Sequence, residues 1–241
     1  MNSTRQSRSI RAVNFDIDNT LYDSNAAQIK LAEVIRQKFP RLFEGIEEQY
    51  VLSAFMDSAA QLTVDYYSGQ PSIGLRERRF RYFLQLLGLN VTHTKAIEEV
   101  YLDAYSTIDT PIPGAVRVVR ELGRVFLLGV ISNSPPEVQY KKLDAIGLRE
   151  AFSCIMLSEE VGIRKPDPRI FYLATDVLKV QAAECVYVGD SYAYDVVGAK
   201  AAGMKACWFN PKSLPSDGFE PKVDIEVKHL EEFPELFNRL C

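Results

Sequence analysis

Short apolar runs recur along the chain, and each is followed by a turn and then by a stretch in which apolar residues have helical spacing. The runs cover residues 12–15, 125–131, 154–157, 185–188 and 206–209. Runs of this length, bounded by turn residues, are typical of strands that are buried on both faces of a sheet. Because strands and helices alternate, the pattern predicts an α/β fold in which a parallel sheet lies between two layers of helices.

One long segment interrupts this alternation. From about residue 25 to residue 107 the apolar residues have helical spacing, and no convincing strand is present. A stretch with two glycines and a proline at residues 68–74 predicts a loop between two of these helices. We therefore expect an α/β core formed by residues 1–22 and 108–241, and an inserted all-helical domain formed by residues 23–107.

The two ends of the chain have different patterns. The first ten residues are polar and basic, so we expect a frayed start and not a signal peptide. Near the other end, apolar residues at helical spacing predict a helix that is interrupted or restarted at Pro234; these are Leu230, Phe233, Phe237 and Leu240. No apolar run approaches the length that spans a membrane.

Composition and charge narrow the range of partners. The chain has 241 residues, of which 47% are hydrophobic and 25% charged, as in ordinary soluble proteins. Its formal net charge of −4 gives no general attraction to nucleic acid or to anionic membranes. The four cysteines are far apart and form no CxxC pair, which favours thiols in a reducing compartment. We expect a cytoplasmic monomer or homodimer.

Pairs of acidic residues follow two of the predicted strands. Asp16 and Asp18 end the first strand, and Asp190 and Asp195 follow the fourth. Acids two residues apart on a strand point to the same side, and the carboxyl ends of parallel strands are where open sheets bind ligands. If the two strands are neighbours, the four carboxylates converge, which favours Mg²⁺. Aspartate also caps helices and forms turns, which explains one strand-end acid better than two pairs.

Polar and basic residues follow the two other strand ends. Ser132 and Asn133 lie just before a helical stretch, where a hydroxyl, an amide and backbone N–H groups could bind an anion. The same residues before two prolines could equally form an ordinary helix cap. Lys165 lies in a turn that two prolines restrain, where it could stabilise both carboxylates and phosphate. A single loop lysine is more often simply solvated.

Taken together and in order, these motifs resemble the four-motif pattern of the haloacid dehalogenase superfamily. The matching segments are Asp16-Ile-Asp-Asn-Thr20, Ser132-Asn133, Lys165-Pro166 and Gly189–Asp195. The resemblance spans residues 12 to about 210, and each motif follows a predicted strand. It implies a Rossmann-like core, with the helical insert as a cap of the first type. The segment Asp-Asn-Thr-Leu-Tyr is similar to the first motif of the nucleotidase and sugar-phosphate phosphatase branches.

The resemblance also implies a phosphatase mechanism. Asp16 would attack phosphorus and form an aspartyl-phosphate, and Asp18 would serve as the acid and then as the base. The phosphoryl oxygens of a small-molecule phosphate ester would be held by Ser132, Asn133 and Lys165.

A magnesium site is implied as well. Mg²⁺ would be bound by the carboxylates of Asp16 and Asp190 and by the backbone carbonyl of Asp18. Asp195 would bind through water or orient the motif lysine, and Thr20 would fix the turn after the acids.

Substrate choice would depend on the cap, and three other functions stay open. Arg76, Arg79 and Tyr82 could contact substrate, although such a cluster is more often a solvated helix face. A phosphosugar mutase would keep the same core residues. The founding dehalogenases typically lack the second acid, so Asp18 argues against a 2-haloacid dehalogenase. A non-catalytic binding protein is disfavoured because every expected core residue is present.

Overall fold

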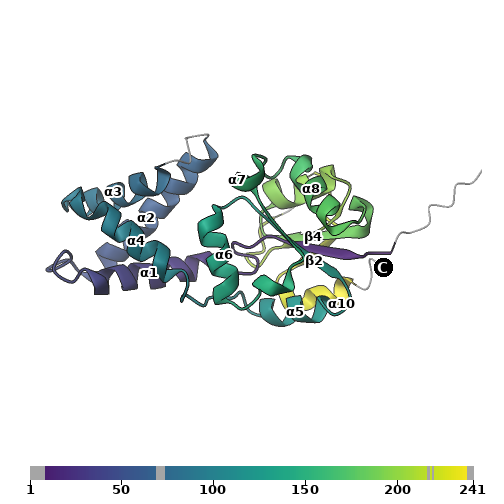
Figure 1. Cartoon of the computed structure of the whole chain (residues 1–241), viewed down its shortest axis with the longest axis horizontal. Helices are drawn as coiled ribbons and strands as arrows, with labels where there is room; N and C mark the ends of the chain where they lie inside the picture. Colours follow the sequence, from purple (N-terminus) through teal and green to yellow (C-terminus); the bar gives the residue numbers. More distant parts are fainter. Residues whose placement is uncertain (1–8, 69–73, 216–217, 219, 238–241) are drawn as a thin grey trace, which may run out of the picture. The chain divides into compact units, whose positions relative to one another are not determined.

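The computed structural model describes residues 9–68, 74–215, 218 and 220–237. The chain divides into two compact units (Figure 1), one formed by residues 1–23 and 110–241 and the other by residues 24–109. These bounds are close to those expected for the core and the helical insert. The predicted frayed start and most of the predicted loop at residues 68–74 lie outside the described residues.

The first unit is built on a parallel sheet with the strand order β3-β2-β1-β4-β5-β6. Its strands are β1 (Ala12–Phe15), β2 (Leu127–Ser132), β3 (Cys154–Leu157), β4 (Cys185–Gly189), β5 (Lys205–Phe209) and β6 (Ile225–Val227). The predicted α/β class and parallel sheet are confirmed. The second strand begins later than expected, because the N–H groups of Val125 and Phe126 still bond back to Leu122. The edge strand β6 was not expected, since three residues are too short to form a recognisable run.

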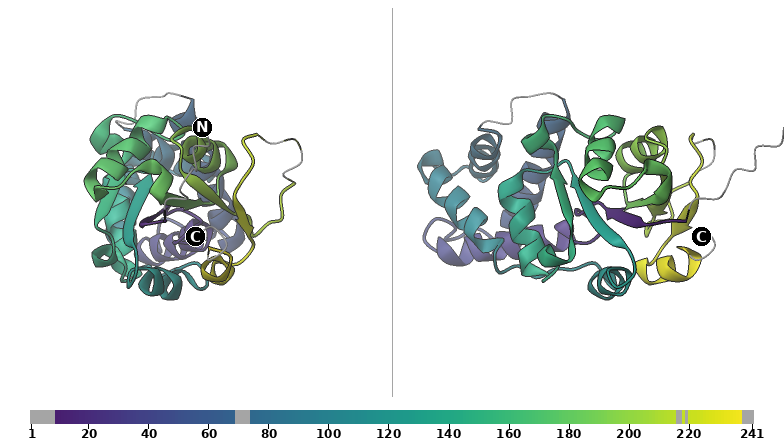
Figure 2. Two further views of the ribbon diagram at one scale, coloured as in Figure 1. Left: turned by 90° about the vertical axis from the view of Figure 1, so that its right-hand side faces the viewer. Right: turned by 45° about the vertical axis from the view of Figure 1, so that its right-hand side comes forward.

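Helices cover both faces of this sheet (Figure 2). They are α5 (Ala115–Leu122), α6 (Pro136–Ala145), α7 (Ser158–Val161), α8 (Pro168–Leu178), α9 (Val197–Ala201) and α10 (Phe233–Phe237). Helix α8 begins where the Asp167 side chain accepts a hydrogen bond from the Arg169 N–H, with a proline at its first position. Ile170, Phe171 and other apolar residues of α8 then pack on the sheet and form part of its hydrophobic core.

The C-terminal pattern resolves into two short elements. A 3₁₀ turn spans Leu230–Glu232, and α10 follows at Phe233–Phe237. Pro234 lies in the first turn of α10, where a missing N–H costs nothing, so the predicted restart occurs there. Leu230, Phe233 and Phe237 are buried, as the helical spacing predicted. Leu240 lies outside the described residues.

The second unit is helical throughout its described residues. It consists of α1 (Ser24–Lys38), α2 (Glu48–Tyr67), α3 (Leu75–Leu86) and α4 (Thr94–Ala104), with a 3₁₀ turn at Val91–His93. Its centre is aromatic, since Phe55 contacts both Phe80 and Phe83. Gly88 ends the α3 region with φ 68°, a left-handed conformation that suits glycine.

Cys154, Cys185 and Cys207 are free thiols buried in strands, and burial raises the pKa of the Cys154 thiol to about 11. A buried thiol with a raised pKa is a poor nucleophile, so we interpret these cysteines as unreactive core residues. No described helix combines the length and the apolar character needed to cross a membrane.

The order of the strands fixes where a ligand can bind. The chain runs from β1 to β2 and β3 on one side, and then from β4 to β5 and β6 on the other. The connections therefore diverge between β1 and β4, which makes the carboxyl ends of these two strands a topological switch point. Open α/β sheets bind their ligands at such a point.

Candidate active site

Three aspartates converge at the carboxyl ends of β1 and β4. The Asp16 N–H extends the ladder by donating to the carbonyl of Val188 at 2.9 Å. Asp190 directly follows β4, and Asp195 lies in the π-helical turn after it, where its Oδ2 accepts from the Ser191 N–H at 3.0 Å. One carboxylate oxygen from each aspartate lies within 4.8 Å of the others. This is the cluster that the two acidic motifs predicted, although the Asp18 carboxylate is not part of it.

Lys165 is buried among these acids. Its Nζ donates to Asp16 Oδ1 at 2.7 Å, to Asp195 Oδ1 at 2.7 Å and to the Tyr187 hydroxyl at 2.8 Å. Burial alone would lower the pKa of Lys165, but the charges of Asp16 and Asp195 outweigh it and hold the pKa well above its ordinary value. The side chain is therefore an ammonium whose three donors are all engaged.

The backbone of Lys165 is held by Asn133. The Asn133 Nδ2 donates to the Lys165 carbonyl at 3.0 Å, and the Lys165 N–H donates to Asn133 Oδ1 at 2.8 Å. The carbonyl of Asn133 in turn accepts from the buried Ser158 hydroxyl at 3.1 Å. The structure thus gives the Asn133 side chain a positioning contact that the sequence did not suggest, while its contact with phosphate stays a prediction.

The crowded acids of this cluster favour the binding of a cation. Burial raises the pKa of Asp16 to about 7, with Lys165 opposing and Asp195 and Asp18 adding to the rise. Burial and then the charge of Asp16 raise the pKa of Asp190 to about 8. The Asp190 carboxylate accepts no hydrogen bond from any residue in the described part of the chain. Three carboxylates thus face one ammonium, an oxygen donor set that suits Mg²⁺.

Asp18 lies in a separate network. Its Oδ2 accepts from the Ser134 hydroxyl and from Gln139 Nε2, both at 2.7 Å, and its Oδ1 accepts from Lys142 Nζ at 2.5 Å. Gln139 and Lys142 come from α6 and were missed by the sequence analysis. The signal for them was present, because two long polar residues three apart share one helix face, and here that face is buried.

Ser132 ends β2 beside this network and is 1% exposed. Its Oγ accepts from Gln139 Nε2 at 2.7 Å and from the Ser134 N–H at 3.3 Å. Both neighbours donate to the oxygen, so the hydroxyl hydrogen remains available to a ligand. A contact between this hydroxyl and a phosphoryl oxygen stays a prediction.

The turn after the acids is fixed by its backbone. The Asn19 N–H donates to the Tyr22 carbonyl at 2.7 Å, and the Leu21 and Tyr22 N–H groups both donate to Ile17 at 2.9 Å. Asn19 has φ 58°, a conformation that asparagine tolerates better than most residues. The Thr20 hydroxyl is buried and has no hydrogen-bond partner among the described residues. The predicted support from Thr20 therefore involves no side-chain hydrogen bond with the described residues.

Gly189 makes room for Asp195, which gives a testable prediction. A Cβ at Gly189 would lie 2.3 Å from Asp195 Oδ2 and 2.4 Å from its Cγ. Since Lys165 and Ser191 hold that carboxylate, Gly189→Ala should lower the free energy of unfolding by about 1–3 kcal/mol through overpacking. Urea unfolding measures the loss. Gly203→Ala, which has no atom within 4 Å of its added Cβ but has φ 83°, reports the cost of backbone strain alone.

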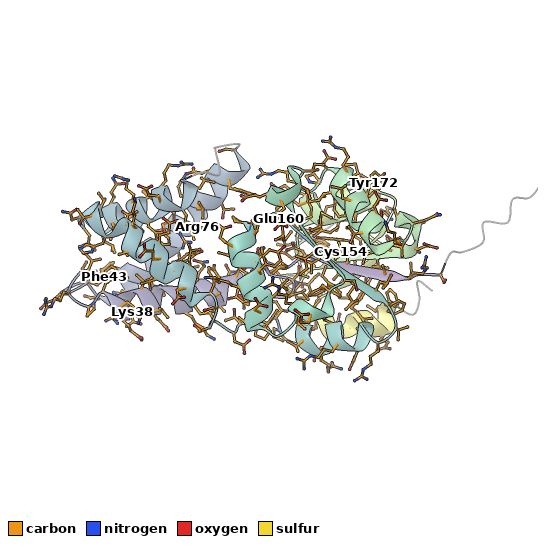
Figure 3. The ribbon with its side chains drawn as sticks, in the orientation of Figure 1. Lys38, Phe43, Arg76, Cys154, Glu160 and Tyr172 are labelled. Atoms are coloured by element: carbon orange, nitrogen blue, oxygen red, sulfur yellow. The ribbon has the colours of Figure 1, made fainter. Side chains whose placement is uncertain are left out.

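The three candidate cap residues have different surroundings within the helical unit. Arg79 is buried and donates to Tyr101 at 2.9 Å, to Gln28 at 2.7 Å and to Ser58 at 3.4 Å. Arg76, labelled in Figure 3, pairs with Glu98 at 3.5 Å, and Tyr82 is exposed. Arg79 is therefore a packing residue inside the unit and does not lie on a solvated helix face. A substrate contact by Arg76, Arg79 or Tyr82 stays a prediction.

Comparison with known proteins gives consistent matches over both units. A family model described as haloacid dehalogenase-like hydrolase matches residues 10–203. The pyrimidine 5'-nucleotidase YjjG of Escherichia coli is 30% identical over 233 residues, covering 94% of this chain and 96% of that protein. The glyceraldehyde 3-phosphate phosphatase of Methanopyrus kandleri is 32% identical over 227 residues, covering 92% of each. A solved 2-haloacid dehalogenase from Pseudomonas syringae has a TM-score of 0.67 at 28% identity, covering 96% of this chain and all of that one.

Proposed function

The chain belongs to the haloacid dehalogenase-like hydrolases, and on this basis we propose that it is a magnesium-dependent phosphatase acting through an aspartyl-phosphate. The substrate would be a small phosphorylated metabolite of the nucleotide or sugar phosphate class, as the names of the two phosphatase relatives suggest. One observation carries the proposal. The two aspartates after β1 are held in different surroundings, Asp16 in the acidic cluster by Lys165 and Asp18 by donors from α6.

We assign the two aspartates different chemical roles. In the first step an Asp16 carboxylate oxygen attacks phosphorus, the bond from phosphorus to the ester oxygen breaks, and that oxygen takes a proton from Asp18. In the second step a water oxygen attacks phosphorus, the bond from phosphorus to Asp16 breaks, and the water proton passes to Asp18. Ser132 and backbone N–H groups bind phosphoryl oxygens, while Lys165 keeps Asp16 oriented and offsets its charge.

The acidic cluster fits a magnesium ion. Asp16 and Asp190 would hold it with their carboxylates, and Asp18 with its backbone carbonyl, while Asp195 is already engaged by Lys165 and Ser191. When bound, Mg²⁺ supplies positive charge that stabilises the transferring phosphoryl group. Asp190 supports this assignment best, because its half-buried carboxylate faces two other acids and its pKa is raised.

The raised pKa values predict how magnesium and pH act on stability. As pH rises from about 4 to 8, the unfolded chain loses protons from Asp16 and Asp190 while the folded site keeps them, so these groups make the metal-free protein less stable. Mg²⁺ binds the deprotonated carboxylates and should raise the Tm more at about pH 8.5 than at about pH 6. Thermal scans with Mg²⁺ or with chelator test this. Equal shifts at both pH values would contradict it, and Asp190→Asn should shrink the shift.

A screen of phosphate release tests the proposed function. The purified protein with Mg²⁺ is offered a broad panel of phosphorylated metabolites, and inorganic phosphate is measured. A phosphatase releases phosphate from part of the panel and loses this activity with chelator. A phosphosugar mutase would interconvert isomers with little release, a dehalogenase would free halide from 2-haloacids, and a binding protein would turn over nothing. Absence of release from the whole panel overturns the proposal.

A further inference from the structure

Helix α6 reaches the candidate acid/base with two side chains. Lys142 Nζ lies 2.5 Å from Asp18 Oδ1, and Gln139 Nε2 lies 2.7 Å from Asp18 Oδ2. Gln139 is fully buried, and the Lys142 side chain is 5% exposed. Residues three apart share one face of a helix, so a single rigid element delivers both groups. Val138 and Leu143 are buried beside them and anchor that face.

The chemistry of these contacts specifies an orientation. An ammonium and a side-chain amide N–H₂ can only donate here, and they contact different oxygens of one carboxylate. Asp18 itself lies in a turn after β1 and not in a regular element. Without donors on both oxygens, its carboxylate could rotate about its side-chain bonds. The contacts from α6 therefore fix the direction in which Asp18 presents its oxygens.

Gln139 adds a second link. The same Nε2 donates to Asp18 Oδ2 and to Ser132 Oγ, both at 2.7 Å. In the proposed reaction Asp18 serves the leaving oxygen and Ser132 serves a phosphoryl oxygen, so one amide sets the spacing between the two. The Gln139 Oε1 is buried without a hydrogen-bond partner among the described residues. A buried unpaired carbonyl is destabilising, so stability alone does not account for a glutamine at this place.

We propose that Lys142 and Gln139 are positioning residues that aim Asp18 at the leaving-group oxygen. The inference rests on the proposed phosphatase function and assigns to α6 a task that no motif residue performs. Lys142 Nζ also lies 5.5 Å from the centre of the Tyr22 ring, a further contact that restrains the lysine. The alternative is a salt bridge that only ties the turn to α6, and this would affect every substrate alike.

Leaving-group dependence separates the two explanations. An alkyl phosphate releases a poor leaving group that needs a proton from Asp18, whereas an aryl phosphate with an acidic phenol needs little help. Lys142→Met should therefore lower kcat/KM for the best alkyl phosphate at least about tenfold more than for p-nitrophenyl phosphate. Lys142→Arg should restore part of the loss. Lys141→Met is the matched control, because the next residue lies on a different side of α6.

A double-mutant cycle completes the test. If Lys142 acts through Asp18, Lys142→Met should cost nothing further in an Asp18→Asn protein assayed with the aryl phosphate. Equal losses for both leaving groups, or a full additional loss in the Asp18→Asn protein, would overturn the inference. Gln139→Leu, which keeps the lysine, gives an independent variant if Lys142→Met does not fold. If the wild type hydrolyses neither ester, the proposed function fails and the inference fails with it.

Discussion

Asp16→Asn should reduce magnesium-dependent phosphate release by at least about 10⁴-fold, because an amide cannot form the phosphorylated intermediate. The fold should survive the change. Asparagine has nearly the same shape, and its carbonyl oxygen can still accept the hydrogen bond that Lys165 Nζ gives to Asp16 Oδ1 at 2.7 Å. The measurement is the steady-state rate on the best substrate of the panel, together with the Tm.

The design of this experiment separates catalysis from structure. Asp176→Asn, an exposed acid on α8, is the matched control and should leave both the rate and the Tm unchanged. Asp16→Asn should keep a Tm close to or above that of the wild type, since it removes one of three crowded carboxylates. If the variant kept more than about a tenth of the wild-type rate, the covalent mechanism would be wrong even though the fold would stand.

The parts of the site that are local in sequence could be predicted from it. Asp16 and Asp18 follow a short buried run, and Asp190 follows another, so their place at the strand ends depends only on strand length. Their convergence needed one further assumption, that β1 and β4 are neighbours, and the strand order confirms it. A strand-end motif is informative because the strand itself positions the side chain.

The parts that depend on tertiary contacts could not be predicted. Lys142 is 124 positions from Asp18 in sequence, and its role becomes visible only when α6 packs beside the turn after β1. The bond between the Asn133 side chain and the Lys165 backbone is of the same kind. Arg79 shows the opposite error, because a charged cluster suggested a solvated face while the guanidinium lies over the rings of Phe55 and Tyr101. Pattern alone does not show which polar residue has buried partners.

Lys165→Met should be the most destabilising single change in the cluster. The lysine is 3% exposed and lies between Asp16 and Asp195, which are themselves buried. Removing the ammonium leaves two buried carboxylates without compensation, and breaking such a pair costs about 3–5 kcal/mol. Activity should also fall at least about 10²-fold, because the nucleophile loses its orienting contact. Urea unfolding at about pH 8 without Mg²⁺ measures the stability term.

A partly exposed ion pair provides the control for this prediction. Lys200 pairs with Asp224 at 2.8 Å on a partly exposed surface, so Lys200→Met should cost no more than about 1 kcal/mol. Adding Asp195→Asn to Lys165→Met should recover part of the lost stability, since it removes one uncompensated charge. The loss should shrink toward about pH 6, where Asp16 can take up a proton because burial raises its pKa. If Lys165→Met and Lys200→Met cost the same at pH 8, the acids at the end of β1 are not held by this lysine.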